Sequence, residues 1–166
     1  MRVIKEYLLP SLESQSCKEF CWLLMSGDKA NITHIKSLIN FNTSFNFEII
    51  YQKDMKKYVR NITKGFDVLI TTRIDYDDRI YYDAVNDVRK AINLNKPLFI
   101  YGYHRGVYYF EANKKYYEFY SREKNEGAMS IFISLISVLK KTNGTYTIYD
   151  LGNHVFVKKT LLQKYK

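Results

Sequence analysis

Cysteine, histidine, proline and glycine are all scarce in this sequence, and the first two shortages exclude whole classes of protein. Among 166 residues there are two cysteines, three histidines, two prolines and seven glycines. Cys17 and Cys21 have no second cysteine pair and no histidine at zinc-ligand spacing, which argues against a disulfide framework and a zinc site. We therefore expect two free, buried thiols.

Long apolar runs are also missing. The longest candidate, residues 131–139, is too short to cross a bilayer. The chain does not open with a basic segment followed by a cleavable apolar stretch, so we predict no secretory signal and a cytoplasmic protein.

The composition that remains is that of a globular protein with a basic surface. A hydrophobic fraction of 46% and a charged fraction of 26% are ordinary for a soluble protein. The length predicts one domain, residues 1–166, which is large enough to form a stable core without disulfides or metal ions. The net charge of +9 indicates an attraction for anions, either nucleic acid, an acidic membrane surface or a phosphorylated small molecule. One local group of cations, usually the sign of a solvated helix face, comprises Lys53, Lys56, Lys57, Arg60 and Lys64.

The first two-thirds of the chain alternate between helical and extended patterns. Helices are predicted over 2–16, where Pro10 should interrupt the helix, over 31–39 and 55–62, and from Asp78 onward with Ile80, Ala84, Val88 and Ile92 on one face. Strands are predicted over 20–25 and 47–51 and from Asp67. This alternation predicts an α/β fold with parallel strands.

The last third has a different pattern. Runs at 97–101, 107–111 and 116–120 have turn-like spacers and predict antiparallel hairpins, with many of the sixteen tyrosines packed on strands. Residues 129–139 are apolar over a helical length and predict a buried helix. Short strands are expected at 147–149 and 155–157. We therefore predict a mixed sheet with flanking helices and an antiparallel C-terminal portion.

An acidic run directly follows one of the apolar strands. The segment 67–78 passes from Val68, Leu69 and Ile70 into three carboxylates at Asp75, Asp77 and Asp78. Ligands of open α/β sheets bind at the carboxyl ends of the strands, and oxygen ligands suit Mg²⁺ or Mn²⁺. The alternative is that Asp77 or Asp78 caps a following helix.

These residues also carry a resemblance to a known family. The sequence Thr-Arg-Ile-Asp-Tyr-Asp-Asp, preceded by Leu-Pro-Ser-Leu-Glu-Ser-Gln-Ser at 9–16 and by a strand with Phe20 and Trp22, resembles the putative rhamnosyltransferase family of nucleotide-sugar glycosyltransferases. The similarity is strongest over residues 7–91. It implies a GT-A, Rossmann-like fold and an enzyme that transfers sugar from a nucleoside-diphosphate donor to a glycan or lipid-linked acceptor.

The resemblance implies roles for individual residues. Asp75 and Asp77 match the DxD motif, whose carboxylates hold Mg²⁺ or Mn²⁺ against the donor diphosphate. Asp78 would contact the sugar or the metal shell, and Arg73 would reach a phosphate or pair with a carboxylate. Asp28 occupies the place of a nucleotide-contacting acid, although a turn residue is an equal alternative.

Later positions are implied in the same way. His154 would contact the metal or the diphosphate, with a plain turn residue as the equal alternative. Glu126 would be the catalytic base, with Glu123 in reserve, and an ordinary helix-start glutamate is the competing interpretation of both. The family also has a nucleotide-binding strand before the helix that begins this sequence. We therefore expect weak donor affinity, or a truncated or reduced member that pairs with another protein or no longer catalyses.

Two other functions compete with this hypothesis. A basic, tyrosine-rich nucleic-acid-binding domain would explain the charge and the tyrosines, but the acidic run would repel phosphate without a metal, so no nucleic-acid partner is expected. A metal-dependent phosphoesterase would want more carboxylates or histidines on other strand ends. Peripheral contact with the inner face of the membrane is compatible with the glycosyltransferase.

Overall fold

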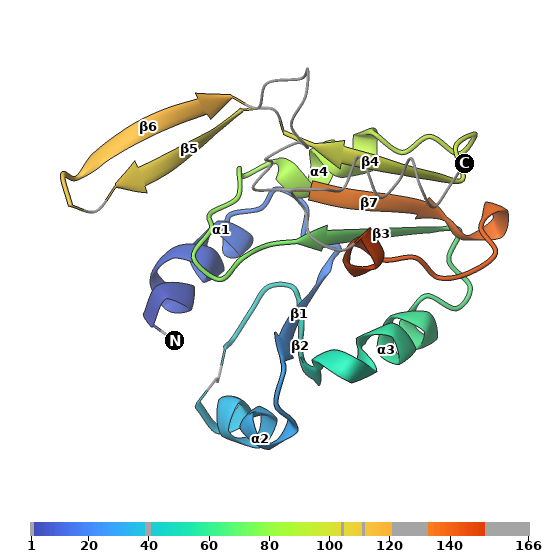
Figure 1. The fold of residues 1–166 in the computed structure, drawn as a ribbon, viewed down its shortest axis with the longest axis horizontal. Coiled ribbons are helices and arrows are strands. Elements are labelled where there is room, and N and C mark those ends of the chain that lie inside the picture. The colour runs from blue at the N-terminus through green and yellow to red at the C-terminus, as the bar shows by residue number, and fades with distance from the viewer. Residues whose placement is uncertain (1, 39–40, 104, 111, 121–132, 152–166) are drawn as a thin grey trace. The chain divides into compact units, whose positions relative to one another are not determined.

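A computed structural model of the chain describes residues 2–38, 41–103, 105–110, 112–120 and 133–151 (Figure 1). The chain forms two compact units, one made of residues 1–66 and 79–92 and the other of residues 67–78 and 93–166. Helices and several sheets, parallel and antiparallel, confirm the predicted α/β class. Every helix in the described ranges is too short or too polar to cross a bilayer.

The first unit contains a parallel strand pair. β1 (Cys21–Ser26) lies beside β2 (Asn46–Tyr51), in a register that places Cys21 opposite Asn46. Parallel neighbours require a crossover, and α2 (Lys29–Leu38) supplies it. The next helix, α3 (Met55–Ile62), lies across the strand pair from α2 (Figure 1). The predicted βαβ unit is therefore confirmed, with α3 at its predicted bounds.

The N-terminal helix accommodates its proline by widening. A π-helical turn over Ile4–Leu8 runs directly into α1 (Leu9–Glu13), in which Pro10 occupies the first turn. Pro10 has no N–H to donate, so the carbonyl of Glu6 loses its usual helical partner. Arg79 donates from Nη2 to that carbonyl at 3.4 Å. The predicted interruption at Pro10 thus takes the form of a wider turn.

The helix expected to begin at Asp78 begins instead at Ala84. This helix, α4 (Ala84–Lys90), buries Ala84 and Val88 as the predicted stripe requires. Buried Gln15 holds the preceding segment out of the helix, because its Nε2 donates to the carbonyl of Tyr81 at 2.7 Å and its Oε1 accepts from the N–H of Val85 at 3.2 Å. A side chain distant in sequence therefore decides where α4 starts.

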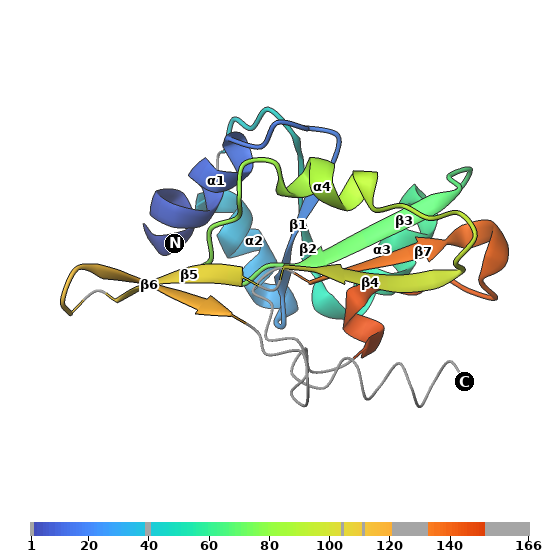
Figure 2. The same cartoon turned by 90° about the horizontal axis from the view of Figure 1, so that it is seen from above.

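The second unit is built on a three-stranded antiparallel sheet. β7 (Ile133–Val138) lies between β3 (Val68–Arg73) and β4 (Leu98–Gly102) and is antiparallel to both (Figure 2). This arrangement corrects two predictions, the helix over 129–139 and the parallel neighbours of β3. All six β7 side chains are buried. A central strand is covered on both faces, so its apolar run has no alternation that distinguishes it from a buried helix.

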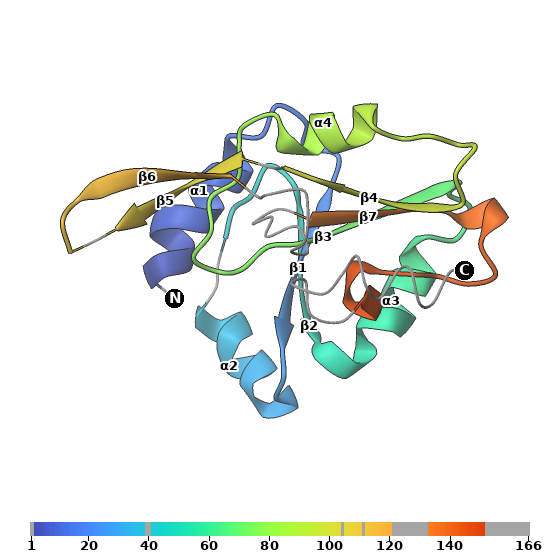
Figure 3. The same cartoon turned by 45° about the horizontal axis from the view of Figure 1, so that its top comes forward.

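The remaining two strands form a hairpin of their own. β5 (Arg105–Phe110) pairs with β6 (Lys115–Tyr120) in antiparallel register, as predicted (Figure 3). The strand expected at 147–149 is instead the 3₁₀ helix η4 (Ile148–Leu151), and the strand expected at 155–157 lies outside the described residues. η4 packs into a buried cluster formed by Ile133, Leu135, Ile148 and Leu151.

Candidate functional site

The acidic run folds back on itself as a β-turn directly after β3. The N–H of Asp78 donates to the carbonyl of Asp75 at 3.1 Å, and the N–H of Asp75 donates to Oδ2 of Asp78 at 3.3 Å. Asp75 and Asp78 therefore close the two ends of the turn, and Asp77 belongs to the stretch between them. β3 ends at Arg73, so the carboxylates follow the end of a strand as the sequence pattern predicted, whereas the turn itself was not predicted.

Arg73 pairs with the first carboxylate of the run. Its Nε and Nη2 both lie 3.3 Å from Oδ1 of Asp75. Both side chains are partly open to solvent, with 37% of Arg73 and 51% of Asp75 exposed, so the pair is not a buried salt bridge. The predicted pairing of Arg73 with a carboxylate is seen here, and Oδ2 of Asp75 remains outside it.

Asp78 is the electrostatically unusual member of the turn. Burial, reinforced by the nearby carboxylates of Asp75 and Asp77, raises the pKa of Asp78 from 3.8 to about 6. The hydrogen bond from the Asp75 N–H and the charge of Arg73 oppose this rise in pKa. Negative charge is thus concentrated at a half-buried oxygen pair, which is the environment that a bound cation would relieve.

Tyr149 is a site residue that the sequence did not indicate. Burial raises the pKa of its hydroxyl, while Arg73 lowers it and Asp75 raises it, so the phenol lies within electrostatic reach of both. η4 is tied to β3 because the N–H of Ile148 donates to Oγ1 of Thr71 at 2.7 Å. An aromatic side chain, 38% exposed, therefore lies near the acidic turn.

A helix-start signal for η4 was present in the sequence. The carboxylate of Asp150 accepts from the N–H of Thr147 at 2.8 Å and from its hydroxyl at 3.0 Å. Thr-x-x-Asp is a variant of the capping box, in which the side chain at the third helical position reaches back to the residue that caps the helix. The prediction of a strand at 147–149 did not take this capping signal into account, and it therefore did not place Tyr149 on a helix.

The carboxylates of the acidic turn do not form a complete metal site by themselves. In the part of the chain that the structure describes, no three His, Cys, Asp or Glu side chains group closely enough to hold a metal. The expected sharing of one ion by all three aspartates is therefore not formed by the protein alone. Mg²⁺ is commonly held by one or two carboxylates together with substrate phosphates. Exposed Asp75 and Asp77 suit such a site.

Asp28 belongs to the first unit, whereas the acidic run belongs to the second. Its Oδ1 accepts from the N–H of Ala30 at 2.9 Å, so this carboxylate caps the start of α2. Its role in nucleotide binding stays a prediction. Three further predicted residues lie outside the described ranges, namely Glu123, Glu126 and His154. Among the predicted site residues, the structure brings together Arg73, Asp75 and Asp78.

Comparison with known proteins identifies a family. A model of the family described as "putative rhamnosyl transferase" matches residues 1–159 of this chain. No curated protein and no solved structure matches the chain. The matched range takes in the whole of the acidic turn, together with Arg73, Tyr149 and Asp28.

Proposed function

The chain belongs to the putative rhamnosyl transferase family, and from that premise we propose that it moves a sugar from a nucleoside-diphosphate donor to a glycan or lipid-linked acceptor. The family resemblance expected from the sequence is confirmed, and the family's description supports glycosyl transfer in general. One observation carries the finer proposal. It is the turn from Asp75 to Asp78 at the end of β3, with Arg73 paired to its first carboxylate.

The donor diphosphate is the ligand that this turn suits best. In the proposal Asp75 and Asp77 hold Mg²⁺ or Mn²⁺, and the bound ion neutralises the negative charge that develops on the departing diphosphate. The guanidinium of Arg73 presents several N–H donors in a plane and contacts a phosphate oxygen, exchanging part of its pairing with Asp75 for that contact. Tyr149 offers a partly exposed ring on which the sugar or base packs.

The acceptor hydroxyl needs a base within hydrogen-bonding distance if the reaction inverts the anomeric centre. Glu126 is the proposed base. Ile133 follows it along the chain and pairs with Arg73 in the sheet, so the start of β7 lies beside the acidic end of β3. Asp78 is proposed to accept a hydrogen bond from a sugar hydroxyl. Its raised pKa of about 6 allows it to carry a proton at mildly acidic pH.

Calorimetry with a nucleoside diphosphate, with and without Mn²⁺, tests the proposal. The variant D75N/D77N should lose Mn²⁺-dependent binding and stay folded, because both side chains are exposed. The matched control D54N/E6Q removes two exposed carboxylates of the first unit and should bind as the wild type does. Unchanged binding in D75N/D77N would refute the site.

A screen of nucleotide sugars, including nucleoside-diphosphate rhamnose, for Mn²⁺-dependent thermal stabilisation should then identify the donor. Binding of ligand to the folded state raises the melting temperature by an amount that grows with the logarithm of ligand concentration over Kd. The rival function, a nucleic-acid-binding domain, predicts the opposite pattern. It would give tight, salt-sensitive binding of single-stranded RNA without any metal in a filter-binding titration.

A further inference from the structure

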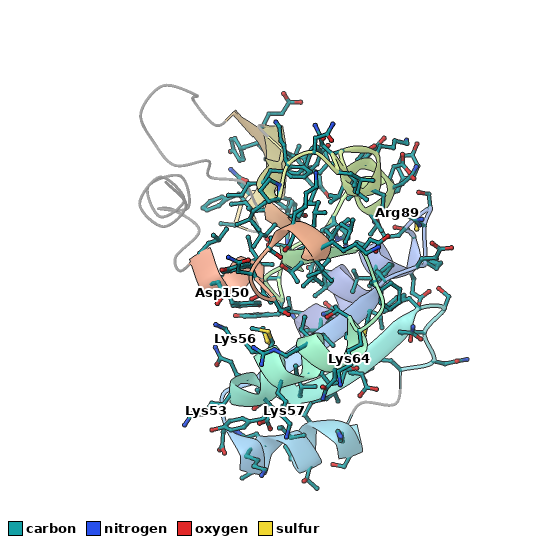
Figure 4. The ribbon with its side chains drawn as sticks, turned by 90° about the vertical axis from the view of Figure 1, so that its right-hand side faces the viewer. Lys53, Lys56, Lys57, Lys64, Arg89 and Asp150 are labelled. Carbon is teal, nitrogen blue, oxygen red and sulfur yellow. The ribbon has the colours of Figure 1, made fainter. Side chains whose placement is uncertain are left out.

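α3 has apolar side chains on one side and charged side chains on the other. Met55 and Val59 are 7% and 3% exposed and face the core of the first unit. Successive helical residues are turned by about 100°, which places Lys57 and Arg60 on the opposite, exposed side. Two more exposed lysines flank the helix. We call this set the α3 basic face, and it consists of Lys53, Lys57, Arg60 and Lys64. Figure 4 labels its three lysines.

No carboxylate in the described ranges neutralises the α3 basic face through an ion pair. Some other exposed cations of the same unit are paired, as Arg2 is with Glu6 and Arg89 with Glu19. Within residues 52–66 the sequence has a single acid, Asp54. The ammonium of Lys53 lies 5.9 Å from the ring centre of Tyr51, a contact that leaves its charge uncompensated. Lys56 has an interaction within the protein and is not counted in this face.

We propose that the α3 basic face binds the anionic surface of a lipid bilayer. Each Lys or Arg held near an anionic bilayer gains from the negative surface potential, and several acting together give stable attachment. Two apolar side chains near the C-terminal end of the helix, Ile62 and Phe66, are 43% and 64% exposed. Ile62 comes seven positions after Met55, so the same helical rotation turns it toward the core side of α3 and away from the α3 basic face. The attachment proposed here is therefore electrostatic.

The lack of exposed rings on the α3 basic face favours a bilayer over a single-stranded nucleic acid. Proteins that hold single-stranded nucleic acid combine a basic groove with aromatic side chains on which the bases stack. The α3 basic face itself presents no exposed aromatic ring, because Tyr51 and Tyr58 are both partly buried. This inference goes beyond glycosyl transfer and depends only on the surface of the first unit, so it can fail while the proposed function holds.

Vesicle sedimentation tests the inference on the full chain. Wild-type protein should sediment with vesicles of phosphatidylcholine mixed with phosphatidylserine and stay in solution with phosphatidylcholine alone. The variant K53Q/K57Q/R60Q/K64Q should bind the mixed vesicles about 100-fold more weakly or worse, since four contributions are removed together. The variant I62S/F66S should bind the mixed vesicles within about threefold of wild type, because neither side chain belongs to the α3 basic face.

The matched control K5Q/K36Q/K96Q/K141Q removes the same number of charges from exposed lysines elsewhere. It should lose less than about tenfold in affinity, because scattered charges do not reach the bilayer together. Urea unfolding of each variant shows that the fold is kept. Equal losses in the two quadruple variants, or no binding of wild type to anionic vesicles, would overturn the inference. Tighter binding to single-stranded RNA, lost in the α3 variant, would overturn it in favour of nucleic acid.

Discussion

The guanidinium of Arg73 lies 3.3 Å from Oδ1 of Asp75, where β3 ends and the acidic turn begins. The side chain of Arg73 therefore already pairs with the carboxylate that we propose as a metal ligand. Arg73 would oppose a divalent ion bound alone, because the two positive charges repel. It would favour the ion bound with a diphosphate, because the ligand brings negative charge for both.

Replacing Arg73 by glutamine should therefore change the two affinities in opposite directions. R73Q should bind Mn²⁺ alone about threefold to tenfold more tightly, since a nearby positive charge is removed. The same variant should bind the nucleoside diphosphate with Mn²⁺ roughly tenfold more weakly, since a guanidinium contact to phosphate is lost. Calorimetry measures both. The control R60Q removes an exposed arginine of the other unit, and equal effects of R60Q and R73Q would show that net charge alone is responsible.

Asp78 should make the stability of the protein depend on pH in an identifiable way. Its pKa is raised from 3.8 to about 6 in the folded protein, so the folded state binds the proton more tightly than the unfolded state does. The stabilisation from this proton is complete below 3.8 and is lost as the pH rises through about 6. Above that range the ionised carboxylate destabilises the fold.

The variant D78N should consequently be more stable than wild type at pH 8 and lose that advantage by pH 4. After allowance for solvent screening of this half-exposed group, we expect a difference of about 1 kcal/mol in the free energy of unfolding. Asparagine keeps an oxygen that accepts from the N–H of Asp75. Urea unfolding at the two pH values measures the effect, and a D78N advantage that is the same at both would contradict the assigned titration.

Two buried serines of β7 should respond in opposite ways to loss of the hydroxyl. The hydroxyl of Ser137 has no hydrogen-bond partner among the described residues, whereas Oγ of Ser134 lies 2.7 Å from Oγ1 of Thr72. S137A removes an unsatisfied buried group and should stabilise the protein by about 0.5–1 kcal/mol. S134A breaks a bond and should destabilise it by about 1–2 kcal/mol. Urea unfolding compares the pair, and a destabilising S137A would reveal a partner for its hydroxyl.

Gln15 should be important for the stability of the first unit. It is 2% exposed, and its amide joins the carbonyls of Ser11 and Tyr81 to the N–H of Val85. Q15L removes all three bonds and leaves the N–H of Val85 without its partner, while the two carbonyls keep the donors of Ser14 and Ala84. It should lower the free energy of unfolding by about 1–3 kcal/mol. The exposed control Q52L should change it by less than about 0.5 kcal/mol. A small effect of Q15L would mean that solvent reaches these groups.

The order of elements up to β3 could be predicted because local signals decide it. The apolar run of β1, the amphipathic pattern of α3 and the acidic run after β3 each specify their own conformation over a few residues. The hairpin of β5 and β6 could be predicted in the same way, because a short turn-like spacer separates two aromatic strands. For the site, this local information was enough to place Arg73 beside Asp75 at the end of a strand.

β7 could not be predicted from local sequence patterns. Its six residues are buried on both faces, so the pattern has neither a period of two nor a clear helical period. β7 is a strand because β3 and β4, both distant in sequence, pair with its two edges. The same limit explains why α4 begins at Ala84, since the side chain that delays it, Gln15, belongs to the N-terminal segment.

The sequence alone determined the family, the α/β class and the presence of carboxylates immediately after a strand. Motifs and short-range periodicity depend only on residues that are close together in the chain. The tertiary structure decided which strands become neighbours and therefore what surrounds those carboxylates. Thr71 anchors η4 and brings Tyr149 near Arg73 and Asp75, and burial raises the pKa of Asp78 to about 6. Hydrogen bonds and burial of this kind join residues that are far apart in the chain, so no local pattern could have revealed them.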